Sequence, residues 1–308
     1  MKGNKRPLIV IVGPTAVGKT EISLRLAEQF QGEIVSADSR LFYIGMDIGT
    51  AKPNQQDQTR IRHHLIDVAQ PDEDWSLALY LPRAVDAIRE IQDRGKIPFL
   101  VGGTGQYIQA VVQGWDLPDT RPDPALREAL ERWSDEVGVE GLRSRLQVLD
   151  PQAAAGIDGP NLRRIIRALE VIMTSGERFS DQKNRQGSPF RTLQIGLIRP
   201  RDELYQRVDQ RVDEMLEGGL VEEVRGLLER GYSPDLSALS AIGYKQISSY
   251  LLGQCSLEEA VRQIKSKTRK FVRHQANWFQ QNDPEIRWFS ASDDPFEEIC
   301  LEIQHFLS

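Results

Sequence analysis

Residues 7–12 read Pro7-Leu-Ile-Val-Ile-Val12, and the chain continues directly into Gly13-Pro-Thr-Ala-Val-Gly-Lys-Thr20. The apolar run predicts a buried strand. The residues after it match the phosphate-loop pattern G-x-x-x-x-G-K-[ST] in the strand–turn–helix context that this motif needs. Gly13 and Gly18 let the backbone turn its N–H groups toward an anion, and a helix predicted over 19–30 adds its positive end. The stretch therefore predicts a site for a diphosphate or a triphosphate.

Every residue of this loop is a candidate for phosphate binding. Lys19 brings a positive charge to the phosphates, and the Thr20 hydroxyl is a suitable oxygen ligand for Mg²⁺. The candidate phosphate-binding residues are Gly13, Pro14, Thr15, Ala16, Val17, Gly18, Lys19 and Thr20. The motif does not say which molecule carries the phosphates.

Length and composition set the class of protein. The chain of 308 residues is 40% hydrophobic and 27% charged, which is typical of a globular protein and allows about two domains. No apolar run approaches the roughly 18–20 residues that cross a membrane, and the run at 7–12 is too short for a signal peptide. Cys255 and Cys300 are too few for a disulfide framework or a zinc site. We therefore expect a cytoplasmic protein with no membrane partner.

The positive charge is concentrated in two stretches, although the formal net charge is −6. Residues 262–274 carry six Lys or Arg and no carboxylate, and residues 161–191 carry seven against three carboxylates. Basic stretches on an acidic protein indicate a localised contact with phosphates. The alternative is a pair of solvated helical faces with ordinary ion pairs.

Apolar runs and amphipathic segments alternate over the first third of the chain. Strands are predicted at 7–12, 33–36, 64–67 and 97–101, and helices at 19–30, 76–94 and 105–113. Such alternation produces βαβ units, so we predict an α/β fold with a parallel sheet like that of the P-loop NTPases, covered by helices. Ligands of these sheets gather at the carboxyl ends of the strands.

The pattern changes after Gly114. A Pro/Asp-rich connector at 116–124, a helical stretch over 125–176 and a polar segment at 180–189 with the composition of a mobile loop follow one another. Further strands are predicted at 192–198 and 285–289, with helices over 201–281 and at the end of the chain. We therefore predict a catalytic core formed by 1–114 and 192–308, interrupted by a helical insertion at 115–191.

Two carboxylates follow predicted strands and compete for the same roles. Asp38 comes after the second strand, at the sheet edge that also holds the phosphate loop. A carboxylate there can ligate Mg²⁺ together with Thr20, or accept a proton. Asp67, after the third strand, is the alternative metal ligand. The fourth strand ends in Val101-Gly-Gly-Thr-Gly105 without a carboxylate, and its glycines suit either a tight turn or the close approach of a ligand.

Arginines at helical spacing suggest two uses. Arg163 and Arg167 share one helix face, so they suit either the phosphate-clamping lid of a small-molecule kinase or a grip on a nucleic-acid backbone. Arg207 and Arg211 are spaced to reach the phosphate pocket, or else to pair with neighbouring carboxylates.

In chain order these motifs resemble the bacterial tRNA dimethylallyltransferases, also called tRNA isopentenyltransferases, over nearly the whole chain. The resemblance rests on Gly13–Thr20, Ser36–Ser39, Gly45–Pro53, His63–Asp67, Val101–Gly105, Arg167–Glu170 and Ile242–Lys245. It implies transfer of a dimethylallyl group from dimethylallyl diphosphate to N6 of the adenine beside the anticodon of tRNA, with release of diphosphate. The alternative, a P-loop nucleotide or small-molecule kinase, predicts that ATP is consumed.

The resemblance also implies roles for particular residues. Asp38 matches the general base of the family, while Lys19, Thr20-bound Mg²⁺ and Arg211 would stabilise the leaving diphosphate. The implied partners are dimethylallyl diphosphate and the tRNA anticodon stem-loop, and we expect a monomer. The positions that match tRNA contacts in the family are Asp38, Ser39, Arg40, Leu41, Thr104, Arg127, Arg163, Arg164, Ile165, Ile166, Arg167, Ser240, Ala241, Ile242, Gly243, Tyr244 and Lys245.

Two positions depart from the family pattern. Leu41 stands where many members have Gln, and Gln106 stands where many have Leu. The first change removes a side-chain hydrogen bond near the adenine. It therefore concerns the selection of the base rather than the reaction.

Overall fold

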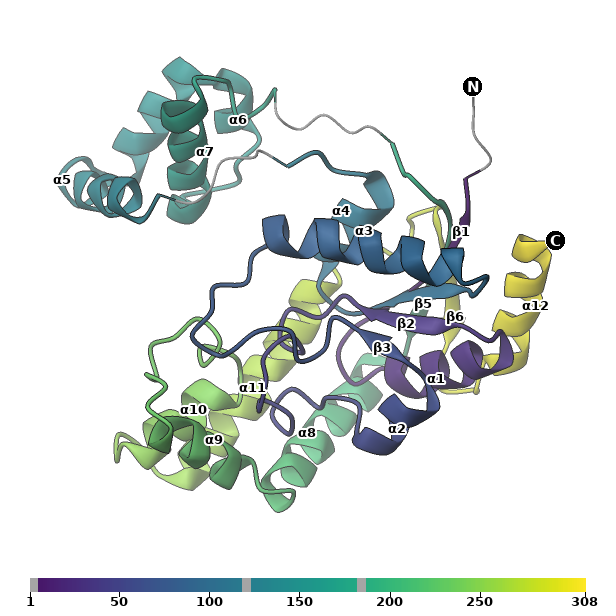
Figure 1. The fold of residues 1–308 in the computed structure, drawn as a ribbon. Helices are drawn as coiled ribbons and strands as arrows, with labels where there is room; N and C mark the ends of the chain where they lie inside the picture. The colour runs from purple at the N-terminus through teal and green to yellow at the C-terminus, as the bar shows by residue number, and fades with distance from the viewer. Residues whose placement is uncertain (1–4, 118–122, 182–186) are drawn as a thin grey trace. The chain divides into compact units, whose positions relative to one another are not determined.

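The computed structural model describes residues 5–117, 123–181 and 187–308. A six-stranded sheet in the order β3-β2-β4-β1-β5-β6 lies at its centre, and all neighbouring strands run parallel (Figure 1). The strands are β1 (Pro7–Val12), β2 (Glu33–Ser36), β3 (His63–His64), β4 (Pro98–Val101), β5 (Arg191–Ile198) and β6 (Ile286–Ser290). The predicted α/β fold with a parallel sheet is confirmed.

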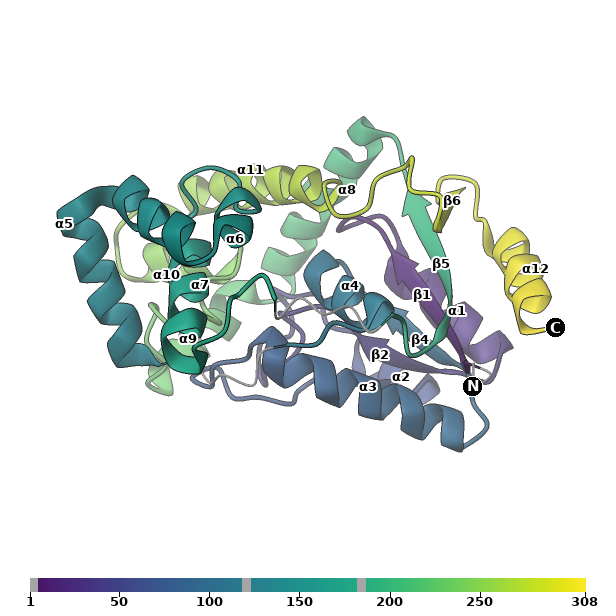
Figure 2. The same cartoon turned by 90° about the horizontal axis from the view of Figure 1, so that it is seen from above.

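Helices cover both faces of the sheet. Ile9 and Ile11 pack in one cluster with residues of α1 (Lys19–Gln29) and α12 (Phe296–Leu307). The opposite face lies under α3 (Leu77–Asp93) and α4 (Gly105–Gln113) (Figure 2). Successive side chains of a strand point to opposite faces, so a strand covered on both sides has to be apolar throughout. The run from Leu8 to Val12 is fully buried for this reason.

A second core lies beside the sheet in the C-terminal part of the chain. It is formed by α8 (Arg201–Glu217), α9 (Leu220–Glu229), α10 (Tyr244–Leu251) and α11 (Leu257–Gln275). The loop after β2 contributes Tyr43 and Met46 to this core. A short helix that the sequence pattern did not predict, α2 (Gln55–Arg60), follows this loop, and the Asn54 side chain caps it by accepting a hydrogen bond from the Asp57 amide.

The contacts divide the chain into two compact units, Met1–Val112 with Ser188–Ser308, and Gln113–Gly187. Within the described residues the second unit contains α5 (Pro124–Leu149), α6 (Pro151–Ala155) and α7 (Leu162–Ser175). Buried leucines and isoleucines of these helices form a core of their own. Gly138 divides α5 into two helices, because its φ of 74° is not helical. None of the described helices has both the length and the apolar composition of a membrane span.

Some local predictions are wrong or lie outside the described residues. The strand predicted at 64–67 ends at His64, because Leu65 and Asp67 have φ values of 60° and 55°, which turn the chain away from β2. The connector predicted at 116–124 falls largely on 118–122, and the loop predicted at 180–189 falls largely on 182–186. Both of these segments are outside the described residues.

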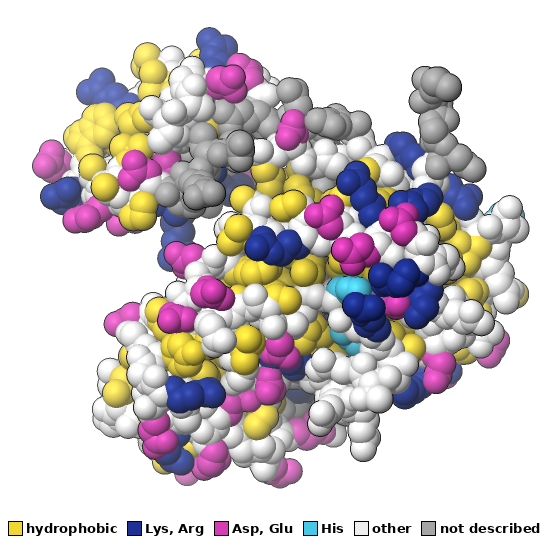
Figure 3. All heavy atoms as spheres, in the orientation of Figure 1, with side chains coloured by type: hydrophobic (Ala, Val, Ile, Leu, Met, Phe, Trp, Pro, Cys, Tyr) yellow, Lys and Arg dark blue, Asp and Glu magenta, His cyan; other side chains and the backbone are white. Residues whose placement is uncertain are grey.

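A buried carboxylate organises the amino ends of the strands, opposite the phosphate loop. The Glu33 side chain is 2% exposed and accepts hydrogen bonds from His64 at 2.7 Å and Arg94 at 2.6 Å, with Lys96 at 2.9 Å. Burial raises the pKa of Glu33, but the hydrogen bonds from His64, Lys96 and Arg94 outweigh it and lower the pKa to about 2. Figure 3 shows Lys and Arg side chains gathered beside histidine on this face. The cluster ties β2 to β3 and to the turn before β4.

Candidate active site

A hollow of about 320 Å³ opens at the carboxyl ends of β1 and β2, within the unit that holds the sheet. Its lining includes Lys19 and Thr20 of the phosphate loop, Asp38 after β2, and Arg211 of α8. The carboxyl ends of parallel strands are where ligands of such sheets bind. The structure therefore brings the predicted phosphate site and the predicted base into one cavity.

The register of the sheet explains why these loops meet. Val101 of β4 pairs with Ser36 of β2 on one side and with Ile11 of β1 on the other. The chain continues from these positions into the phosphate loop, into the turn that holds Asp38, and into the glycines after β4. Residues far apart in sequence are thus placed side by side at one edge of the sheet.

The phosphate loop needs its first glycine for two reasons. Gly13 has a φ of 147°, and a Cβ atom at this position would lie 2.7 Å from the Leu197 carbonyl oxygen of β5. The Lys19 ammonium donates hydrogen bonds to the carbonyl oxygens of Gly13 at 2.9 Å and Pro14 at 2.8 Å. Burial lowers the pKa of Lys19 to about 8, while Asp38 raises it. A bound anion would oppose this effect of burial and hold the proton on Lys19.

Two arginines of α8 complete the positive lining, as the spacing predicted. The Arg207 Nε donates to the Ala16 carbonyl at 2.9 Å, and Arg211 donates to the Thr50 carbonyl at 3.4 Å. Burial lowers the pKa of Arg211, and the Asp38 carboxylate opposes this shift. Two neighbouring carboxylates of α8, Asp209 and Asp213, pair with Arg269 and Lys265 of α11. Glu214 still acts on Arg211 and, like Asp38, opposes the effect of burial on its pKa.

Asp38 is held by the backbone of its own turn. Its Oδ1 accepts a hydrogen bond from the Arg40 amide at 3.0 Å, and its own amide donates to the Ser36 hydroxyl at 3.3 Å. Within the described residues, Oδ2 has no hydrogen-bond partner. A half-buried carboxylate with one oxygen held and the other available can accept a proton from a group that enters the hollow.

Thr104 fastens the turn after β4 to the turn after β2. Its hydroxyl accepts a hydrogen bond from the Ser39 amide at 3.2 Å, and its amide donates to the Ala37 carbonyl at 3.2 Å. A Cβ atom on Gly102 would lie 2.2 Å from the same Ala37 oxygen. The sequence left open whether the glycines after β4 serve a tight turn or the close approach of a ligand. At Gly102 the structure supports the tight turn, because the strand ends pack closely there.

Gln275 is a site residue that the sequence did not indicate. It lies at the end of α11, is 4% exposed, accepts a hydrogen bond from the Thr15 amide at 2.8 Å and donates to the Gly103 carbonyl at 3.1 Å. A Cβ atom on Gly103 would lie 2.4 Å from its amide nitrogen. Its only sequence signal is a neutral amide beside a basic run, which does not point to the phosphate loop.

Asp67, the alternative metal ligand, is engaged elsewhere. The Lys52 ammonium lies 2.5 Å from Asp67 Oδ1, 2.5 Å from Asp47 Oδ1 and 2.9 Å from the Tyr43 carbonyl oxygen, and the Lys52 side chain is 3% exposed. Asp67 does not line the hollow, whereas Asp38 does. Lys52 also gives a structural reason for the string Gly45–Pro53, because it holds both ends of this loop together.

The hollow offers oxygen donors of the kind that Mg²⁺ prefers. Thr20 is exposed at the mouth, and Asp38 lines the same cavity. Within the described residues there is no group of three or more His, Cys, Asp or Glu side chains arranged for a metal. A hydroxyl, a carboxylate and substrate phosphates are a typical Mg²⁺ environment, in which water fills the other positions. The donor set thus fits a metal that is brought with a diphosphate.

In the second unit, the predicted RNA-contacting residues divide into buried and exposed ones. The Arg127 guanidinium donates two hydrogen bonds to the Glu170 carboxylate, one to each oxygen, at 2.8 and 3.0 Å. Arg167 donates a further hydrogen bond to the same carboxylate at 2.6 Å. Burial raises the pKa of Glu170, but these hydrogen bonds outweigh it and keep the pKa below its ordinary value. Ile165 and Ile166 lie in the core of this unit, whereas Arg163 and Arg164 are exposed.

The segment at 240–245 shows the same division. Ala241, Gly243 and Tyr244 are buried, whereas Ser240 and Lys245 are exposed. Arg40 connects this region to the turn that holds Asp38, because its guanidinium donates to the Ser237 carbonyl at 2.9 Å. Ser240 and Lys245 are therefore the side chains of this segment that an RNA can reach most easily.

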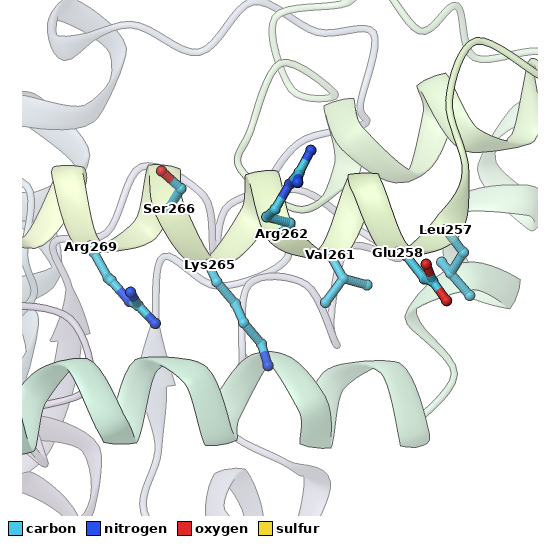
Figure 4. Close-up of a pocket in the computed structure, with 7 residues that line it drawn as sticks. All are labelled: Leu257, Glu258, Val261, Arg262, Lys265, Ser266 and Arg269. Carbon is cyan, nitrogen blue, oxygen red and sulfur yellow. The ribbon is translucent and has the colours of Figure 1, made fainter.

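The basic run on α11 is partly neutralised. Lys265 lies 2.7 Å from Asp213, Arg269 pairs with Asp209, and Arg262 pairs with Glu259. Figure 4 shows Lys265 and Arg269 pointing from α11 toward α8, where they border a second, more open hollow of about 570 Å³. For these three cations the alternative reading, ordinary ion pairs, is correct. Lys267 and Lys270 are exposed.

Comparison with known proteins gives consistent matches along the chain. The family model described as IPP transferase matches residues 41–282. The tRNA dimethylallyltransferase of Roseiflexus sp. (strain RS-1) is 52% identical over 275 residues, which cover 89% of this chain and 90% of the relative. The tRNA dimethylallyltransferase of Thermomicrobium roseum is 47% identical over 97% of this chain and 91% of its own length.

Solved structures show the same relationship. The full-length tRNA isopentenylpyrophosphate transferase of Bacillus halodurans is 42% identical, with a TM-score of 0.72 over 99% of this chain and 96% of its own. A eukaryotic dimethylallyltransferase, whose crystal structures capture it acting on tRNA, is 26% identical, with a TM-score of 0.83 over 97% of this chain and 77% of its own.

Proposed function

Since the chain belongs to the IPP transferase family, we propose that it is a tRNA dimethylallyltransferase. It transfers a dimethylallyl group from dimethylallyl diphosphate to an adenine of tRNA and releases diphosphate. The adenine N6 beside the anticodon is the proposed acceptor. The observation that supports this reaction best is that Asp38 lines the same hollow as the phosphate loop and Lys19.

The leaving group determines what the positive residues do. Bond cleavage puts negative charge on the diphosphate, and donors that are already in place stabilise that charge without reorganisation. We assign this role to the amides of the loop Gly13–Thr20, to Lys19 and to Arg211. The second arginine of α8, Arg207, braces the loop through the Ala16 carbonyl.

Mg²⁺ is the proposed metal. The Thr20 hydroxyl would ligate it together with the substrate phosphates. Asp38 lines the same cavity and could provide a further oxygen ligand. When bound, the ion adds positive charge beside the diphosphate oxygens. The phosphate loop and Arg211 position the diphosphate whether or not Asp38 also ligates the metal.

Asp38 is the proposed general base. An exocyclic amine of adenine is a weak nucleophile and has to lose a proton as the new C–N bond forms. The available oxygen of Asp38 would take that proton, while the hydrogen bond from the Arg40 amide keeps the carboxylate oriented. Positioned proton acceptors of this kind contribute about 10²–10⁴-fold to a rate.

The RNA has to present its base to this hollow. An adenine in a stacked loop reaches such a pocket only after it leaves the stack, at a cost of a few kcal/mol. We propose that Ser39, Arg40, Leu41 and Thr104 surround the base. The insertion at 115–191, through Arg163 and Arg164, and the exposed members of 240–245 would grip the anticodon stem-loop. Within the second unit, Arg127 and Arg167 would hold α5 and α7 together through Glu170.

One assay separates this function from that of a kinase. The protein is incubated with an anticodon stem-loop and either labelled dimethylallyl diphosphate or labelled ATP. We expect label on the RNA with the first compound and no phosphate transfer with the second. Transfer from ATP, without prenylation, would overturn the proposal. A tRNA substrate also implies that the protein works in the cytoplasm, and we expect it to work as a monomer.

A further inference from the structure

One side of the hollow is formed by a loop rather than by a strand or a helix. Thr50, Ala51 and Pro53 line the cavity, and the Thr50 carbonyl accepts the hydrogen bond from Arg211. The Ala51 amide donates to the Ile48 carbonyl at 2.9 Å and the Lys52 amide to the Asp47 carbonyl at 2.9 Å, so this wall moves together with residues 47 and 48. The contacts just before Thr50 therefore decide where this wall stands.

A carboxylate on α9, Glu223, holds residues 47–49, which lie directly before Thr50 in this loop. Glu223 accepts hydrogen bonds from the backbone amides of Asp47 at 2.9 Å, Ile48 at 2.8 Å and Gly49 at 3.2 Å. Three consecutive amides that converge on one carboxylate are a strong, directional anchor. Glu223 itself does not line the hollow.

A buried tyrosine supports the same carboxylate from behind. The Tyr244 hydroxyl donates to Glu223 at 2.6 Å, and its side chain is fully buried. Burial raises the pKa of Tyr244, so this phenol remains a donor at any physiological pH. A Cβ atom on Gly49 would lie 2.5 Å from the tyrosine ring, which shows how closely the loop backbone rests on it.

We propose that Glu223 is a positioning residue for the diphosphate. By fixing residues 47–49, it holds the Thr50 carbonyl, and through that carbonyl it aims Arg211 into the hollow. Lys52 ties the loop to Asp67 and to the Tyr43 carbonyl, and Glu223 ties it to α9. This inference rests on the proposed function, in which the hollow binds a diphosphate.

Replacing Glu223 by Gln keeps the size of the side chain but removes its charge. The amide group turns one acceptor into a donor, so at least one of the converging donors loses its partner. The loop then loses its tie to α9, and the Thr50 carbonyl no longer holds Arg211 in one position. Glu222→Gln is the matched control, because it makes the same change at an exposed carboxylate of α9 that pairs with Arg225 and does not touch the loop amides.

The test is titration calorimetry with inorganic pyrophosphate, together with steady-state kinetics. We expect Glu223→Gln to weaken pyrophosphate binding about tenfold, or about 1.4 kcal/mol, and Glu222→Gln to leave it at the wild-type value. In kinetics, Glu223→Gln should raise the KM for dimethylallyl diphosphate more than it lowers kcat. Wild-type pyrophosphate affinity in folded Glu223→Gln, whatever its melting temperature, would overturn the inference.

Two further outcomes keep the test decisive. If Glu223→Gln does not fold, Glu223→Asp takes its place, because a shorter carboxylate keeps the charge but cannot reach all three amides. Unchanged pyrophosphate affinity in Glu223→Asp then contradicts the inference. If the wild-type protein does not bind pyrophosphate at all, the proposed function fails first, and the inference fails with it.

Discussion

The amide of Thr15 donates a hydrogen bond to the side chain of Gln275 at 2.8 Å, which joins the phosphate loop to a residue 260 positions further along the chain. The same side chain holds the Gly103 carbonyl, so one buried amide fixes two of the three strand ends that form the site. The phosphate loop is therefore shaped by tertiary contacts as well as by its own sequence.

Loss of this contact should loosen the phosphate loop. Gln275→Ala leaves a donor and an acceptor without their partner, at a cost of about 1–3 kcal/mol. We expect a lower melting temperature together with weaker pyrophosphate binding. Gln280→Ala, at an exposed position on the same segment, serves as the control and should match the wild type. Normal pyrophosphate affinity in Gln275→Ala would show that the contact does not shape the anion site.

The base assignment can be tested against the competing carboxylate. Asp38→Asn should lower kcat for prenyl transfer by about 10²–10⁴-fold. Measured at pH 7 without Mg²⁺, it should leave pyrophosphate binding close to wild type, because the loop amides, Lys19 and Arg211 remain in place. Asp67→Asn should have little effect on kcat, since Asp47 still pairs with Lys52. The reverse pattern, a silent Asp38→Asn and an inactive Asp67→Asn, would transfer the role to Asp67.

Binding of the diphosphate should depend on the charge of Lys19. Its pKa in the free protein is lowered to about 8, and a bound anion favours the charged form. Affinity for pyrophosphate should therefore be highest below pH 8 and fall as the pH rises through this value. Lys19→Arg stays charged throughout, so the ratio of the two affinities isolates Lys19 from the titration of pyrophosphate itself. A ratio that does not change with pH would contradict the assignment.

The exposed arginines of the second unit should act through RNA phosphates. Arg163→Ala with Arg164→Ala should weaken binding of an anticodon stem-loop and reduce the salt dependence of log K by about 1 for each lost phosphate contact. Arg132→Ala, an exposed arginine of α5, is the control. Arg127→Ala should instead lower the melting temperature, since Glu170 is buried and loses its two-pronged partner. An unchanged salt slope in the double variant would argue against this surface as the RNA grip.

The buried Glu33 cluster should make stability depend on pH. A carboxylate whose pKa is lowered to about 2 on folding stabilises the protein above its unfolded value near 4.5, and this contribution is lost as the pH falls toward 2. Glu33→Gln should destabilise the protein at pH 7 by about 2–3 kcal/mol, and the difference should shrink at pH 3. A difference of equal size at both pH values, measured by denaturant unfolding, would show that the charge does not matter.

The parts of the fold that were predictable are those with local causes. The run Leu8–Val12 is apolar because it is covered on both faces, and the phosphate loop carries its own glycines. The location of Asp38 followed from its place after a strand. Gln275, Lys52 and Glu223 carry no such signal, because their partners lie on distant elements that only the folded chain brings near. The sequence left Asp67 open as an alternative to Asp38, because nothing in it shows that positive φ values at Leu65 and at Asp67 itself end β3 at His64.

The charged stretches show a second limit of sequence reading. A helical run of Lys and Arg has the same pattern whether it faces RNA or pairs with another helix. On α11, Arg269 and Lys265 form ion pairs with Asp209 and Asp213 of α8. On α7, Arg167 forms an ion pair with Glu170. Which charges remain available to a partner depends on packing, which neighbouring residues in sequence do not reveal.

β5 pairs with β1 at every position from Pro7 with Arg191 to Val12 with Gly196, so the centre of the sheet joins chain segments that flank Gln113–Gly187. The described part of that intervening stretch contributes no strand to the sheet. On the proposed assignment, substitutions within this one continuous piece of the gene alter part of the grip on the anticodon arm and leave the paired strands as they are.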